Sequence, residues 1–117
     1  MLMVMGALAG LLGVALAAAA AHGPGGPNLE TASRFLLFHA PVLLVIVAFA
    51  EARSINPVAG RLAGWAMVLG LALFCGDLVT RAWRNTALFP MAAPTGGFVL
   101  MASWALIGIA ALMRLWR

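Results

Sequence analysis

The sequence MLMVMGALAGLLGVALAAAAA, residues 1–21, contains only methionine, leucine, valine, glycine and alanine. A helix rises about 1.5 Å per residue, so about 20 apolar residues cross the hydrocarbon core of a bilayer, which is about 30 Å thick. This stretch therefore predicts a transmembrane helix, and similar stretches recur along the chain.

A secretory signal peptide is the alternative for this first segment, because small residues precede His22 as they do at a cleavage site. The basic region that opens such peptides is missing, since neither lysine nor arginine precedes Arg34. We expect the segment to be a true span.

Three further runs are long and apolar enough to cross a bilayer. They cover residues 31–51, 62–80 and 96–113. A membrane β-barrel would instead show alternating segments of about ten residues. We predict an all-α integral membrane protein whose single domain, residues 1–117, holds four transmembrane helices in a compact bundle.

The composition excludes an ordinary soluble domain, because 65% of the 117 residues are hydrophobic and only 9% are charged, against about 25% charged in soluble domains. The net charge of +4 comes from arginines scattered between apolar runs. Nucleic acid requires a dense basic face, so we expect the lipid bilayer and no nucleic acid as partner. A single cysteine, Cys75, excludes an internal disulfide and a cysteine-built metal cluster.

The arginines give a weak indication of orientation. Four spans place both termini and residues 52–61 on one side, with four arginines against three on the other. The two sets are Arg53, Arg61, Arg114 and Arg117, and Arg34, Arg81 and Arg84. The positive-inside rule then favours cytoplasmic termini.

Glycines spaced four apart mark candidate packing faces, because small residues let membrane helices approach closely. Gly6 and Gly10 form one such pair in the first span, and Gly60 and Gly64 form another at the start of the third. We interpret them as intramolecular packing positions, and an oligomer or partner face is the alternative.

Both histidines, two of the three acids and two arginines are expected in the half of the membrane opposite the termini. This candidate intramembrane polar cluster comprises His22, Glu30, Arg34, His39, Asp77 and Arg81. The four-residue spacings of its acids and arginines favour two helical ion pairs. Ionisable groups inside a membrane raise the question of function, so His39 and Asp77 have either structural roles or a role in proton or ligand handling.

No motif indicates catalysis. The chain contains neither a paired-carboxylate motif, nor a nucleophile with a base, nor a phosphate-binding glycine loop. Haem ligation by His22 and His39 is an alternative, but the two are expected at different depths. We therefore predict no enzyme, no catalytic residue, no metal site and no cofactor.

Several short motifs, taken in order, resemble one family. They are Ala21-His22-Gly23, Thr31-Ala32, Arg34-Phe35, Phe38-His39-Ala40, Ala63-Gly64-Trp65, Phe74-Cys75-Gly76 and Pro94-Thr95-Gly96-Gly97 before Trp104. Together they resemble the small membrane proteins grouped as domain of unknown function 423, which include bacterial YgdD and eukaryotic transmembrane protein 256. The resemblance covers nearly the whole chain and implies a four-helix protein of the bacterial inner membrane with no established reaction.

The chain departs from that family near its polar residues. The family usually has tyrosines at Phe35 and Phe38, and serines at Cys75 and Asp77. The missing phenol groups weaken a proton relay beside His39, and any role of Asp77 is particular to this chain.

These observations favour a non-enzymatic accessory or structural subunit that packs against a larger membrane complex, respiratory or photosynthetic. A membrane-protein partner or a homo-oligomer is expected. The alternative is a small transporter or proton-conducting protein that uses His39 and Asp77.

Overall fold

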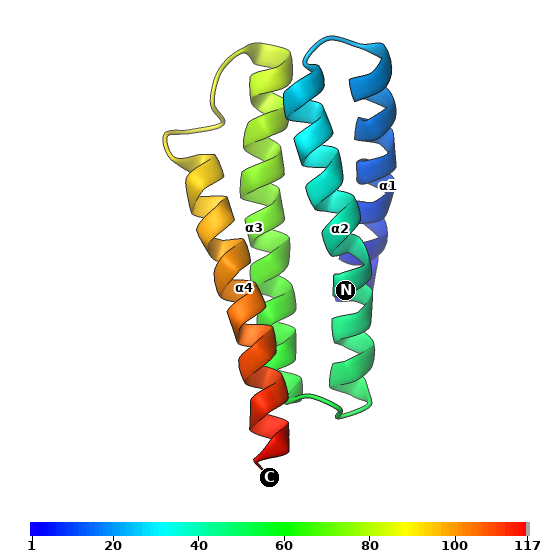
Figure 1. Cartoon of the computed structure of the whole chain (residues 1–117), viewed down its shortest axis with the longest axis vertical. Coiled ribbons are helices and arrows are strands. Elements are labelled where there is room, and N and C mark those ends of the chain that lie inside the picture. The colour runs from blue at the N-terminus through cyan, green and yellow to red at the C-terminus, as the bar shows by residue number, and fades with distance from the viewer. Residues whose placement is uncertain (117) are drawn as a thin grey trace.

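Four α-helices make up the protein in a computed structural model that describes residues 1–116. They are α1 (Leu2–His22), α2 (Gly26–Glu51), α3 (Pro57–Arg84) and α4 (Ala92–Leu115), shown in Figure 1. Each is long and apolar enough to cross a membrane, and the described residues contain no strand. The predicted all-α membrane bundle is confirmed. Arg117, one of the four arginines expected beside the termini, lies outside the described residues.

Three helices begin before the apolar runs predicted for them. They are α2, which begins at Gly26, α3, which begins at Pro57, and α4, which begins at Ala92. Asn56 caps α3, since its side-chain oxygen accepts hydrogen bonds from the amides of Val58 (3.1 Å) and Ala59 (3.0 Å). Pro57 follows in the first turn, where the missing N–H has no cost. Pro27 has the same place in α2. The positions of the bilayer boundaries along these longer helices stay a prediction.

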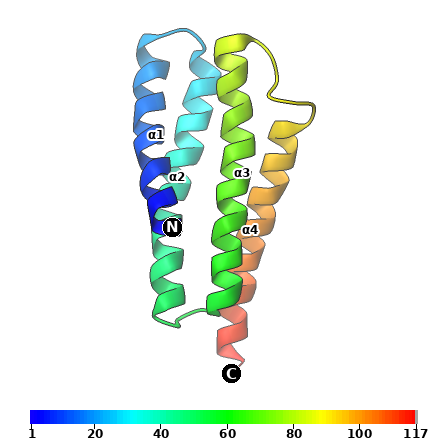
Figure 2. The same ribbon diagram turned by 180° about the vertical axis from the view of Figure 1, so that it is seen from behind.

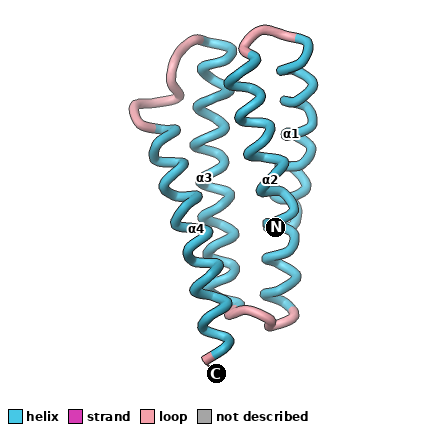
Figure 3. Tube along the Cα trace, viewed as in Figure 1, coloured by secondary structure: helices cyan, strands magenta, loops and turns pink. Residues whose placement is uncertain are grey.

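Each helix packs mainly against its neighbour in the sequence. The close pairs are α1 with α2, α2 with α3, and α3 with α4, whereas α1 meets α3 at only a few residues. Figures 1 and 2 show α1 and α4 at opposite ends of this arrangement. The connections between the helices are short, as the loops in Figure 3 show. Because α2 and α4 share no close backbone contact over the described residues, their facing sides leave a groove.

The core lies along α2 and α3 in the middle of the arrangement. Leu29 and Leu43 of α2 and Met67 of α3 have no exposed surface. A second cluster at the end with the short 52–56 loop includes Ile55 and Ala110. Outward side chains of α1 and α4 remain apolar and exposed, as expected for surfaces that face lipid.

The four glycines expected to pack all face other parts of the same chain. A Cβ at Gly6 would lie 2.9 Å from Leu44 Cδ2, and one at Gly64 would lie 2.9 Å from Leu2 Cδ1. Gly60 faces Ile55 at 2.7 Å, and Gly10 is looser, 3.7 Å from Ala40.

Among the glycines, the tightest contact with a neighbouring helix is at Gly96, outside that set. A Cβ at Gly96 of α4 would lie 2.5 Å from the backbone nitrogen of Phe74 and 2.9 Å from the carbonyl oxygen of Gly70, both in α3. Backbone atoms cannot rotate away as a side chain can, so Gly96 fixes the α3–α4 contact. Sequence spacing did not identify this glycine as a packing residue.

Candidate intramembrane polar site

His39 links two helices through its imidazole ring. The residue is 5% exposed. Nδ1 lies 2.7 Å from the carbonyl oxygen of Phe35 one turn earlier in α2, and Nε2 lies 3.2 Å from the indole nitrogen of Trp104 in α4. Since an indole N–H only donates, Nε2 must accept and Nδ1 must carry the proton. The geometry therefore assigns a neutral imidazole whose two nitrogens are both engaged.

A groove of about 550 Å³ opens beside this hydrogen bond, between α2 and α4. We call it the α2/α4 groove. Aromatic rings dominate its walls, and its lining residues are Arg34, Phe35, Phe38, His39, Phe74, Gly97, Leu100, Met101 and Trp104. The rings of Phe35 and Phe38 lie 5.7 and 5.5 Å from the ring of His39. The groove is thus mainly apolar, with one arginine at its edge.

Asp77 is fully buried in α3 and holds the α3–α4 loop. One carboxylate oxygen accepts a hydrogen bond from Arg81 Nε at 2.7 Å, and the other accepts one from the backbone N–H of Leu88 at 2.7 Å. Arg81 itself is about half exposed. Both oxygens of Asp77 are engaged, and the residue ties residues 85–91 back to the last turns of α3.

The six residues predicted as one polar cluster do not converge. Glu30 and Arg34 form an exposed ion pair on α2, and Asp77 and Arg81 form a second pair on α3. Arg34 lines one groove with His39 and a separate pocket with Glu30. Each acid is paired within its own helix, because the four-residue spacing satisfies it locally. No carboxylate is thereby directed toward His39.

His22 and His39 are likewise far apart along the bundle. His22 is exposed at the end of α1, next to the C-cap residue Gly23. His39 lies 13 residues after the first residue of α2, about 20 Å along the helix axis. This separation gives no support to haem ligated by both imidazoles.

Buried side chains join neighbouring helices, among them two serines that the sequence did not single out. Ser33 Oγ donates to the carbonyl oxygen of Gly13 and Ser103 Oγ to that of Ala63, each at 2.7 Å. Cys75 Sγ approaches the carbonyl oxygen of Ala32 at 3.6 Å. Over residues 1–116, every buried side-chain nitrogen or oxygen has a partner. A lone serine inside an apolar helix is the signal that could have identified these bonds.

Four membrane-length helices joined by internal polar contacts define a small multi-pass membrane protein. The chain belongs to the family described as "Protein of unknown function (DUF423)", whose model matches residues 16–97. The resemblance seen in the sequence motifs is confirmed.

Curated relatives cover nearly the whole chain. The UPF0382 membrane protein YwdK of Bacillus subtilis is 32% identical over 120 residues, which is 96% of each chain. The UPF0382 membrane protein SERP0230 of Staphylococcus epidermidis is 29% identical and covers 93% of each chain. No solved structure matches the chain.

Proposed function

We propose that this protein is a non-enzymatic accessory or structural subunit of the bacterial inner membrane that packs against a larger respiratory or photosynthetic complex. The observation that carries this proposal is the α2/α4 groove. Gly97 lies in its wall, and a Cβ built there would meet nothing within 4 Å. A transmembrane helix of the partner would occupy the groove.

Membrane helices associate by close packing, since lipid tails are as apolar as their side chains. Gly97 leaves room for another backbone, and the rings of Phe38 and Trp104 offer large flat contact surfaces. Met101, 59% exposed, adds a flexible apolar side chain that adapts to a partner. These are properties of a helix-packing surface.

The hydrogen bonds of His39 and Asp77 within the chain support a non-catalytic role. His39 uses both ring nitrogens and Asp77 both carboxylate oxygens in contacts within the chain. A general base or a metal ligand needs a free lone pair directed at its target. Trp104 occupies the one lone pair of His39 Nε2, and the carboxylate of Asp77 is fully buried beside Arg81 and Leu88.

Proton conduction by His39 and Asp77, the alternative function, has less support from the geometry. The two side chains have separate partners, on α4 and on the α3–α4 loop. Reconstituted protein should give no proton flux above empty vesicles, and His39→Ala with Asp77→Asn should change nothing. Flux that disappears in this double variant would favour conduction over the subunit role.

We also propose cytoplasmic termini. The arginines favour this orientation by four to three under the positive-inside rule, since Arg53, Arg61, Arg114 and Arg117 are expected beside the termini and Arg34, Arg81 and Arg84 on the other side. Paired reporter fusions at the C-terminus, one active only in the cytoplasm and one only outside it, would test the orientation.

Purification from the native membrane in mild detergent tests the subunit role. A photoreactive amino acid at Met101 in the groove should crosslink to a transmembrane segment of one co-purifying protein. The same group at Leu11, on the outward face of α1 and 66% exposed, is the matched control. Crosslinking from both positions alike, or only to a second copy of this chain, would contradict a dedicated partner.

A further inference from the structure

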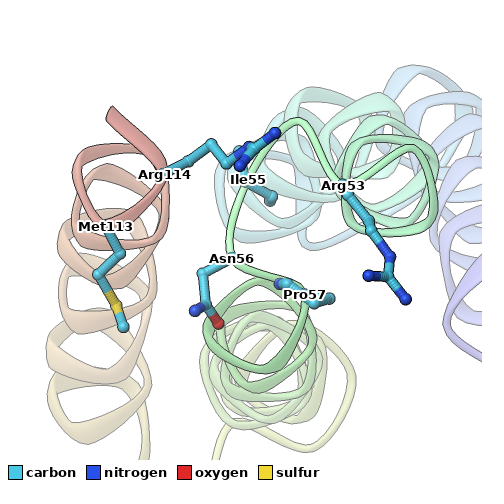
Figure 4. A pocket seen from close by; sticks show the side chains of 6 residues that line it. All are labelled: Arg53, Ile55, Asn56, Pro57, Met113 and Arg114. Atoms are coloured by element: carbon cyan, nitrogen blue, oxygen red, sulfur yellow. The ribbon is translucent and has the colours of Figure 1, made fainter. Parts of the chain in front are cut away.

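The end of the bundle that carries the C-terminus contains a basic pocket outside the groove. Its volume is about 230 Å³, and its lining residues are Arg53, Ile55, Asn56, Pro57, Met113 and Arg114. Figure 4 shows Arg114 extending from α4 toward Ile55, while the side chain of Arg53 points away from Arg114, on the side of Pro57 that is far from α4. We call it the Arg53/Arg114 pocket.

The two arginines come from separate segments that are fixed to each other. The backbone N–H of Asn56 donates to the carbonyl oxygen of Ala110 at 2.9 Å, and Ala110 lies one helical turn before Arg114. Ile55, 6% exposed, anchors the same loop in the second core cluster. The backbone of the loop that carries Arg53 is therefore held against the part of α4 that carries Arg114.

Neither guanidinium group has an acidic partner among residues 1–116. Within residues 1–116 the ion pairs are Glu30 with Arg34 and Asp77 with Arg81. Glu51, the remaining acid of the chain, lines a different pocket together with Arg61. The Arg53/Arg114 pocket thus holds two positive charges and no lining carboxylate.

We propose that the Arg53/Arg114 pocket binds the phosphate of an anionic phospholipid in the leaflet nearest the termini. Guanidinium groups bind phosphate oxygens with paired N–H donors. Basic pockets between membrane helices are suited to anionic lipid headgroups. The exposed side chain of Met113 lies against the glycerol and the first carbons of the acyl chains.

A bilayer lipid fits this pocket better than a free anion does. The pocket combines charge with apolar walls, and it lies at a helix-bundle end where headgroups surround the protein. Lipid binding here is independent of the partner proposed for the α2/α4 groove. The pocket lies at the α2–α3 loop, the start of α3 and the end of α4, and it shares no lining residue with that groove.

Lipid-dependent thermal unfolding in detergent tests the site. Phosphatidylglycerol should raise the unfolding midpoint of the wild-type protein, as any ligand of the folded state does, whereas phosphatidylcholine at the same mole fraction and inorganic phosphate should not. In the Arg53→Gln/Arg114→Gln variant, the mole fraction of phosphatidylglycerol for half-maximal effect should rise about 30-fold. Arg61→Gln/Arg84→Gln removes the same two charges elsewhere and should retain wild-type binding.

A folding control accompanies this comparison. Arg53 has φ 54°, a left-handed conformation that glycine adopts at lower cost, so Arg53→Gly removes the charge and relieves the backbone. It should unfold in lipid-free detergent no earlier than the wild type and still bind phosphatidylglycerol more weakly. Equal protection by inorganic phosphate, unchanged binding in the pocket variants, or equal weakening in Arg61→Gln/Arg84→Gln would overturn the proposal.

Discussion

Trp104 of α4 donates its indole N–H to Nε2 of His39 in α2 across 3.2 Å, at a level where the backbones of the two helices are not in close contact. The bond spans one wall of the α2/α4 groove. It defines the tautomer of His39 and holds the indole beside the rings of Phe35 and Phe38. A histidine that invited a functional interpretation in the sequence thus joins α2 to α4 in the wall of this groove.

Replacement of Trp104 by phenylalanine should destabilise the protein by about 1 kcal/mol, because Nε2 of His39 loses its donor while an aromatic ring is retained. The free energy of unfolding in mixed micelles measures the loss. Trp116→Phe is the control, since Trp116 is 88% exposed. Equal stability of the two variants would show that the Trp104–His39 bond contributes nothing.

The two helical ion pairs should differ sharply in their contribution to stability. Asp77→Ala removes two charge-assisted hydrogen bonds from a fully buried carboxylate and should cost about 2 to 3 kcal/mol. Glu30→Ala breaks a pair whose side chains are both more than half exposed, and it should cost less than about 1 kcal/mol. Asp77→Ala should also speed proteolysis within residues 85–91, which the carboxylate holds through Leu88. Intact loop protection in that variant would contradict the anchoring role.

Alanine substitutions at two adjacent glycines near the start of α4 give a matched pair of variants. Gly96→Ala places a methyl group 2.5 Å from a backbone nitrogen of α3, so α3 and α4 must separate, at a cost of about 2 kcal/mol or more. Gly97→Ala enters open space and should be neutral or stabilising by up to about 1 kcal/mol, because alanine favours the helix. Thermal melts of the two variants test this, and comparable melts would mean that the α3–α4 contact is wrongly placed.

The single cysteine reports on the integrity of the α2–α3 interface. Cys75 is 5% exposed and its thiol faces the carbonyl oxygen of Ala32. A small maleimide should label the folded protein in detergent far more slowly than the denatured protein. Gly96→Ala should accelerate labelling and Gly97→Ala should not. Rapid labelling of the folded wild-type protein would contradict the burial of this residue.

The helices were predictable because the bilayer imposes one length and one composition on every span. Residues 1–21 and the three later runs needed no tertiary information. The first residues of the helices were harder to predict. Helices α2 and α3 begin at Gly26 and Pro57, several residues before their apolar runs begin. Capping by Asn56 is the local feature that explains the early start of α3.

The site was predictable only in part, because three-dimensional neighbours decide what a polar residue does. The spacing of Asp77 and Arg81 predicted their pair, but the bond from Leu88 depends on how the loop folds back. The sequence placed His39 inside a span and could not identify Trp104, 65 residues away, as its partner. Gly96 and Gly97 were equivalent in the sequence, and only the direction of each residue on α4 distinguishes packing against α3 from the groove.

The partner role of the α2/α4 groove is tested most directly by filling it. Gly97→Leu places a large side chain in the groove, at a position where a Cβ has open space. Gly108→Leu places the same side chain on α4 where a Cβ also has open space, outside the groove lining. Both variants should fold and melt like the wild type. The amount of co-purifying partner per subunit, measured by quantitative mass spectrometry after native purification, should fall at least about tenfold in Gly97→Leu and stay unchanged in Gly108→Leu, whereas equal recovery of the partner with both variants would contradict the account.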